Sequence, residues 1–194
     1  MKKLCRDFYE RDTLEVAKDL LGKYIVYDNM EEQIIVKITE VEAYKGVDDK
    51  ACHTYGGRRT PRTEVMWGQA GHAYIYIIYG MYYCFNIVTE KEGNPCAVLI
   101  RGVEPIENIS KMTYNRYNRT YSELNRYQIK NFTNGPGKLC KAIGLDLRHN
   151  GLDLLSDKLY VCDNNEIVNI KEAKRINIDY AEEAADYLWR FYIE

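Results

Sequence analysis

Residues 74–86 read Tyr-Ile-Tyr-Ile-Ile-Tyr-Gly-Met-Tyr-Tyr-Cys-Phe-Asn, and the segment from Tyr74 to Val88 carries the strongest β signal in the chain. Tyrosine and isoleucine favour strands, and a central glycine suits a tight turn. The pattern predicts a hairpin with Tyr79-Gly80 at its tip. Tyr79 would project from the end, either as a wedge that enters DNA between base steps or as ordinary surface of an amphipathic strand pair. One face of the hairpin would carry Tyr74, Tyr76 and Ile78.

Upstream of the hairpin, residues 33–44 predict a long strand whose side chains alternate between two faces. Glu40 and Glu42 would point the same way, together with Ile38, and the residues between them would take the other face. Two carboxylates among apolar neighbours favour a raised pKa on one of them. This pair is either part of a reactive site or a salt-bridged pair at a strand end.

A polar, irregular segment over residues 48–62 joins these two parts. Such loops often carry function. The Gly56-Gly57 pair lets the backbone come close to a ligand, and the arginines that follow suit phosphates. His53 in this segment is either a structural hydrogen-bonding group or part of a site.

Local signals place the remaining elements. Asp12 and Glu15 resemble a capping box that starts a helix, which Gly22 would end. A second helix would begin at Pro136 and end at Gly144. We expect further strands at 23–27, 96–103, 159–162, 173–178 and 189–193, a helix and a mobile loop within 108–133, and a short Ala/Glu-rich segment at 181–188. The whole predicts an α+β fold in which residues 1–194 form a single domain.

Basic residues are concentrated, although the net charge is −2. Residues 108–141 carry seven lysines and arginines against the single acidic residue Glu123. With the arginines of the 48–62 segment they would form either a cationic face or a solvated basic loop. Arg101, in a mostly apolar strand, needs an anion such as Glu42 or a phosphate. Lys138 and the helix start beside it also suit a phosphate.

The composition limits the class of protein. With 194 residues, of which 46% are hydrophobic, the chain is long enough for one well-buried core. It has no apolar run of the roughly 20 residues that span a bilayer and no apolar segment behind its basic N-terminus, so we expect a cytoplasmic protein. The six cysteines are scattered, which predicts reduced thiols and no zinc site.

The chain resembles the 3-methyladenine (alkyladenine) DNA glycosylases of base-excision repair. The matching blocks follow one another in the family's order across nearly the whole chain: Glu40-x-Glu42-Ala-Tyr44, Gly-Gly-Arg-x-Thr-Pro-Arg within 53–62, Tyr76 to Asn86, Leu99 to Pro105, Gly135 to Leu139, Arg175-Ile176 and Arg190-Phe191-Tyr192. The resemblance implies a curved antiparallel sheet with packed helices and a protruding hairpin that inserts into DNA. Such a domain is similar to the C-terminal domain of formyltransferases and needs no metal or other cofactor.

The resemblance also implies residue roles. Glu42 would activate a water for attack on the deoxyribose C1′, and Arg101 and the backbone carbonyl of Ile176 would help to hold that water. The extruded base would lie among Tyr44, His53 and Tyr76, with Asn86 at the pocket floor. The duplex would be held by an intercalating Tyr79 with Met81 beside it, and by phosphate contacts from Arg58, Thr60, Arg62 and Lys138.

The implied activity is that of a monofunctional glycosylase that removes 3-methyladenine, 7-methylguanine and other damaged purines from double-stranded DNA. We expect a monomer of bacterial type that works at the nucleoid. Two other functions stay open on the residues alone. One is a nucleoside hydrolase that uses Glu40 and Glu42 as an acid and base pair. The other is a non-catalytic module that binds damaged DNA or RNA.

Overall fold

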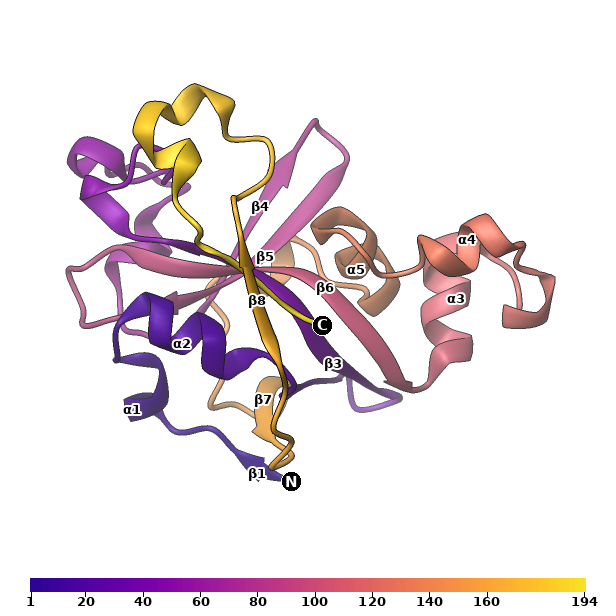
Figure 1. The fold of residues 1–194 in the computed structure, drawn as a ribbon. Helices are drawn as coiled ribbons and strands as arrows, with labels where there is room; N and C mark the ends of the chain where they lie inside the picture. Colours follow the sequence, from indigo (N-terminus) through magenta and orange to yellow (C-terminus); the bar gives the residue numbers. More distant parts are fainter.

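The structure is a computed structural model that describes residues 1–194. Strand β3 (Gln33–Tyr44) lies at the centre of its sheet. The sheet around it has nine strands, all paired antiparallel, in the order β1-β7-β2-β3-β6-β5-β4, with β9 beside β3 and β8 beside β9 (Figure 1). The other strands are β1 (Lys2–Lys3), β2 (Tyr24–Asp28), β4 (Ala73–Ile78), β5 (Tyr82–Thr89), β6 (Cys96–Glu107), β7 (Leu159–Asp163), β8 (Ile170–Ala173) and β9 (Arg190–Ile193). This sheet and its helices confirm the predicted α+β class.

Strand β3 changes partner along its length. One edge pairs with β6 throughout, whereas the other edge pairs first with β2 and then, from Glu40 to Glu42, with β9. The β3–β6 ladder has register shifts on both sides of Glu40. Ile38 before the shift and Val41 after it both join the main core.

This irregularity corrects the predicted alternation. An extra residue in a ladder reverses which side chains face the core. The prediction that Ile38 shares a face with Glu40 and Glu42 is therefore wrong, because Ile38 faces the core. The two carboxylates do lie on a common side, because both contact Arg101 of β6.

The first long helix forms where its cap predicts it. Helix α2 (Thr13–Leu20) follows the short α1 (Arg6–Tyr9), and the Asp12 carboxylate accepts hydrogen bonds from the amides of Leu14 and Glu15. Buried Val16, Ala17 and Leu20 hold α2 against the sheet, where it packs on β3 and β6. Gly22 beyond the helix has φ +83°, a conformation that favours glycine.

Helix α5 (Pro136–Ile143) also agrees with the prediction, since Pro136 starts it and Gly144 ends it at φ +90°. It packs on β5 and β6, while α3 (Ile109–Tyr117) packs on α5 and α4 (Arg126–Lys130) lies farther out (Figure 1). Short 3-10 helices occupy Gly46–Asp48, Tyr55–Gly57, Glu64–Trp67, Tyr121–Glu123, Leu147–His149 and Asp179–Asp186.

Two predicted strands were wrong in extent. Strand β6 runs to Glu107 rather than stopping at residue 103, because the first half of β3 offers it partners as far as Ile35. Strand β8 covers Ile170–Ala173 rather than residues 173–178. After Ala173 the chain leaves the sheet, the Arg175 side chain is buried, and Asn177 adopts φ +60°.

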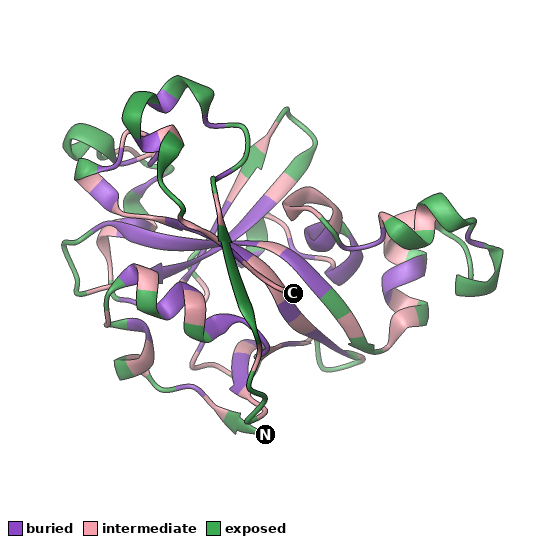
Figure 2. Cartoon of the chain, viewed as in Figure 1, coloured by how far each residue is buried: buried purple, intermediate pink, exposed green.

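The buried residues are concentrated at the centre of the sheet, whereas most of α4 and the tip of the β4–β5 hairpin are exposed (Figure 2). Cys5 is exposed, and the other five cysteines are buried with free thiols, as the scattered spacing predicted. None of the helices has both the length and the apolar character needed to cross a membrane.

The aromatic hairpin is confirmed as β4 and β5. Its tip residues Tyr79 and Gly80 have φ +53° and +68°, and the Met81 amide donates to the Ile78 carbonyl over 3.3 Å. The hairpin rests on α5 at Gly137, where a Cβ atom would come within 2.8 Å of the Tyr82 Cβ. Only glycine therefore allows the strand and the helix to approach this closely.

We expect Gly137→Ala to lower the free energy of unfolding by about 1–3 kcal/mol, the usual cost of overpacking. The cost arises because the nearest atoms belong to the Tyr82 Cβ and inner ring, which move only with the strand. Chemical denaturation measures the change. Gly68→Ala is the matched control, since Gly68 has φ −84° and its Cβ would have ordinary contacts at 3.5 Å. Equal losses for both variants would contradict the packing argument.

Candidate active site

A cavity of about 750 Å³ opens between the second half of β3, the β4–β5 hairpin and the start of α5. Aromatic and polar side chains line it. Most of the residues singled out by the sequence are among them: Tyr44, His53, Arg62, Tyr76, Tyr79, Asn86, Arg101, Lys138 and Ile176. Glu42, Arg58, Thr60 and Met81 lie outside the lining.

One wall of the cavity is aromatic. The His53 ring lies 4.6 Å from the Tyr76 ring at an interplanar angle of 76°, and the Tyr74 ring is 5.4 Å from Tyr76. The His53 Nδ1 and the Tyr74 hydroxyl are 2.9 Å apart and share a hydrogen bond. The sequence predicts Tyr74 on this face of the hairpin but no role for it. The wall offers flat, electron-rich surfaces to a planar ligand.

The environment of His53 keeps its ring neutral. Burial is the main cause that lowers the pKa of His53 to about 4, and the positive charges of Arg62 and Arg58 lower it further. At neutral pH the imidazole therefore carries one N–H and one acceptor nitrogen. It can exchange a hydrogen bond with a ligand without adding charge to the cavity.

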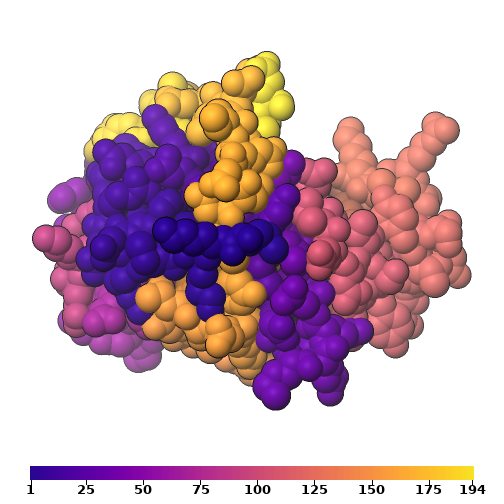
Figure 3. Space-filling view, turned by 90° about the horizontal axis from the view of Figure 1, so that it is seen from below, coloured from indigo at the N-terminus to yellow at the C-terminus, as the bar shows by residue number.

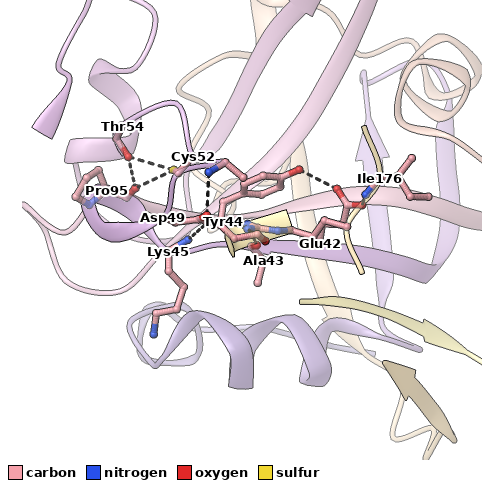
Figure 4. A network of polar contacts seen from close by, with 12 residues as sticks. Glu42, Ala43, Tyr44, Lys45, Asp49, Cys52, Thr54, Pro95 and Ile176 are labelled. Atoms are coloured by element: carbon pink, nitrogen blue, oxygen red, sulfur yellow. Dashed lines mark hydrogen bonds and ion pairs between the residues drawn. The ribbon is translucent and has the colours of Figure 1, made fainter. Parts of the chain in front are cut away.

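Glu42 is fully buried, and its carboxylate is hydrogen-bonded to Tyr44 and Ile176, two residues that line the cavity (Figure 4). Its Oε1 accepts the backbone N–H of Ile176 over 2.8 Å, and its Oε2 accepts the Tyr44 hydroxyl over 2.8 Å. Ile176 thus contacts Glu42 through its amide; its carbonyl, which the resemblance expects to hold the water, is a separate group. The donors come from β3 itself and from the segment after β8, so the carboxylate is fixed by parts of the chain that are distant in sequence.

Arg101 is shared by the two glutamates of β3. Its Nη1 lies 3.4 Å from Glu42 Oε2, and its Nε donates to Glu40 Oε1 over 3.3 Å. The anion that an arginine in an apolar strand requires is therefore Glu42, as predicted, together with Glu40. Arg190 of β9 also donates to Glu40, over 3.1 Å. Glu40 is held between two arginines and does not line the cavity.

These contacts leave Glu42 suited to accept a proton. Burial raises the pKa of Glu42, while Arg101, the Ile176 amide and the Tyr44 hydroxyl oppose that rise. A carboxylate has about four acceptor positions. The three partners of Glu42 leave one acceptor position on Oε1 without a protein partner.

Arg175 is a site residue whose role is not predicted from the sequence. It donates to both Asp49 oxygens, over 2.5 and 2.8 Å, and to the Ala43 carbonyl over 2.9 Å. Its guanidinium carbon lies 4.8 Å from the Tyr44 ring and 5.0 Å from the Trp189 ring. Arg175 therefore supports Tyr44 from behind and fixes the segment that presents the Ile176 amide. An arginine next to Ile176 was visible in the sequence, but its buried partners were not.

Asn86 lies deep in the cavity, with 4% of its surface exposed. Its side-chain amide donates to the Tyr74 carbonyl over 3.0 Å. The amide nitrogen is thus bound to the neighbouring strand, and the side chain is held in one orientation.

The rim of the cavity is exposed and basic. At the hairpin tip, 76% of Tyr79 and 67% of Met81 are exposed. Arg58 and Arg62 are exposed on the loop, where Thr60 forms hydrogen bonds with Thr63. Lys138 at the start of α5 donates to two neutral side chains, Asn131 and Asn134.

We expect the His53 ring to stay neutral until the pH falls to about 4. NMR titration of the histidine Hε1 signals measures this, and His53→Gln assigns the resonance. A midpoint near the ordinary value of about 6.5 would contradict the buried, positively charged surroundings described here.

Residues 7–194 match the profile of the methylpurine-DNA glycosylase (MPG) family. A protein of Clostridium novyi (strain NT) is 58% identical over 194 residues, covering 100% of this chain and 96% of its own length. A protein of Desulfitobacterium hafniense (strain Y51) is 54% identical over 195 residues, with 100% and 96% coverage. Both are named "Putative 3-methyladenine DNA glycosylase". The chain therefore belongs to the methylpurine-DNA glycosylase family and, with it, to the hydrolases that act on N-glycosyl bonds.

Proposed function

We propose that this protein is a monofunctional DNA glycosylase that extrudes alkylated purines from duplex DNA and hydrolyses their N-glycosyl bond. The observation that carries the proposal is the buried Glu42 carboxylate, which is held by two hydrogen bonds and one ion pair from residues that line an aromatic cavity. The proposed substrates are 3-methyladenine and 7-methylguanine, with hypoxanthine and ethenoadenine as further candidates. The product is an abasic site that starts base-excision repair.

The cavity suits a damaged purine. An alkylated purine is cationic, and the faces of Tyr44, His53 and Tyr76 attract and stack such a ring. Asn86 at the pocket floor would help to reject normal guanine. Extrusion costs a few kcal/mol and is cheapest for damaged or mismatched pairs, which adds selectivity.

The reaction needs one carboxylate. Glu42 accepts a proton from the water bound at Oε1, the water oxygen forms a bond to C1′, and the bond from C1′ to the purine nitrogen breaks. The bonding electrons leave with the purine, which needs little protonation because it is already cationic. Arg101 and the Ile176 carbonyl are the proposed partners of the water. Glu40, held by Arg101 and Arg190, supports Arg101 rather than acting as a second acid, which argues against a nucleoside hydrolase that uses both carboxylates.

The outer residues would hold the duplex. Tyr79 would fill the space that the extruded nucleotide leaves, with Met81 beside it, and Arg58, Thr60, Arg62 and Lys138 would contact phosphates. These contacts and the cavity would belong to one domain of formyltransferase type that acts as a monomer in the bacterial cytoplasm, at the nucleoid.

We expect Glu42→Gln to bind duplex containing an alkylated adenine but to release base at least about 100-fold more slowly than wild type, since loss of a positioned general base typically costs 10²–10⁴-fold. Single-turnover base release from the labelled duplex measures the rate. Glu104→Gln is the matched control, because Glu104 is an exposed β6 carboxylate that pairs with Lys37.

Wild-type release should also fall as the pH is lowered through the raised pKa of Glu42, because only the ionised carboxylate accepts the proton. Normal release by Glu42→Gln would remove Glu42 from the mechanism. No release by wild type, with tight lesion binding retained, would instead indicate a non-catalytic damage-binding module.

We expect Tyr79→Ala to slow base release from duplex at least about tenfold more than release from a single strand, because a single strand leaves no base-pair gap to fill. Single-turnover assays on the same oligonucleotide, with and without its complement, measure the ratio. Tyr55→Ala, an exposed tyrosine on the 3-10 helix Tyr55–Gly57, is the control. Equal losses on both substrates would count against the wedge.

A further inference from the structure

Most lysines and arginines of this protein pair with a carboxylate, and those that do not are unevenly distributed. The cations without a carboxylate within 4.0 Å are Lys2, Arg58, Arg62, Lys91, Arg116, Arg119, Arg126, Lys130, Lys138, Lys141 and Lys158. Apart from Lys2, Lys91 and Lys158, all lie at residues 58–62 or 116–141, two segments that both contribute cations to the lining of the cavity: Arg62, Arg116 and Lys138.

Residues 109–130, which form α3, the 3-10 helix Tyr121–Glu123 and α4, are here called the outer lobe. The lobe projects from the sheet, as the space-filling view from below shows on its right side (Figure 3). The carboxylate of its acidic residue, Glu123, accepts hydrogen bonds from the backbone N–H and the hydroxyl of Thr120 within the lobe. Of its cations only Lys111 has a partner, Glu32 of the β2–β3 turn. The far half of the lobe therefore carries uncompensated positive charge.

The outer lobe is continuous with the cavity. Arg116 and Tyr127 line the cavity together with Tyr79 and Lys138. Burial and the nearby positive charge of Arg116 lower the pKa of Lys138. These two cations therefore lie near each other, and neither has a carboxylate partner. Tyrosines are exposed among the cations: 61% of Tyr114, 43% of Tyr121 and 76% of Tyr127.

We propose that the outer lobe is a second DNA-binding surface, which contacts the phosphates of undamaged duplex beside the lesion through Arg119, Arg126 and Lys130. Cations that lack protein partners release counterions when they meet phosphates, which favours binding independently of sequence. Exposed tyrosine hydroxyls add hydrogen bonds to the same backbone. This inference rests on the proposed function, since it takes duplex DNA as the partner, and it extends the footprint beyond the cavity and hairpin.

The test compares two triple variants with the same change in charge. The lobe variant is Arg119→Gln/Arg126→Gln/Lys130→Gln, and the control variant is Lys2→Gln/Lys91→Gln/Lys158→Gln, whose residues are also unpaired but lie outside the lobe and the cavity lining. Fluorescence anisotropy with undamaged duplex, over a series of salt concentrations, gives the slope of the logarithm of the binding constant against the logarithm of salt. Circular dichroism checks that both variants fold.

We expect the lobe variant to lose about 2 to 3 units of that slope, since each phosphate contact contributes about 0.9, and the control variant to keep the wild-type slope. An unchanged slope for the lobe variant, or an equal loss in the control, would overturn the proposal, as would wild-type binding that does not depend on salt. The measurement involves no base release, so its failure is distinguishable from failure of the glycosylase reaction, which Glu42→Gln tests. Should the lobe variant not fold, the single variants Arg126→Gln and Lys91→Gln replace the two triple variants. We then expect Arg126→Gln to lose about 0.9 units of the salt slope and Lys91→Gln to keep the wild-type slope.

Discussion

The burial of the Glu42 carboxylate is the constraint on which the rest of the structure depends. An ion without solvent contact costs several kcal/mol unless charges and hydrogen bonds replace the lost water. Here the replacements come from three places: the Tyr44 hydroxyl on the same strand, Arg101 on β6, and the Ile176 amide near the end of the chain. The sheet order β9-β3-β6 brings these together. The polar contacts that offset the burial also fix the position of the carboxylate next to Tyr44, Arg101 and Ile176, which line the cavity.

A second layer of charges supports this arrangement. Glu40 joins Arg101 to Arg190 of β9, and Arg175 joins Asp49 to the segment that presents Ile176. Removing one partner of a buried pair leaves the other charge uncompensated, which costs more than the pair contributes. The C-terminal residues are therefore part of the site, although none of them is expected to react.

The surface has regions where lysines and arginines pair with carboxylates and regions where they do not. Over most of the molecule, lysines and arginines pair with carboxylates, so a net charge of −2 coexists with a rim that is locally positive. Three unpaired cations, Arg62, Arg116 and Lys138, line one cavity together with Tyr79 of the hairpin tip and Tyr127 of the outer lobe. A polyanion is attracted to this face, whereas the paired charges over most of the remaining surface largely cancel. The overall charge is thus a poor guide to the partner, and the local pairing is a better one.

The sequence by itself determined the elements whose signals are local. The Asp12 cap, Pro136 and Gly144 marked helices, tyrosine, isoleucine and Gly80 marked the hairpin, and Glu42 with Arg101 was recognisable as a charged pair. Only the tertiary structure decided the rest. The register shift at Glu40, which moves Ile38 to the core, and the extension of β6 to Glu107 depend on how two strands fit along their length. The role of Arg175 depends on Asp49 and Ala43, which are distant in sequence. Local propensity acts over a few residues, whereas ladder register and buried charge pairing are fixed only when distant segments meet.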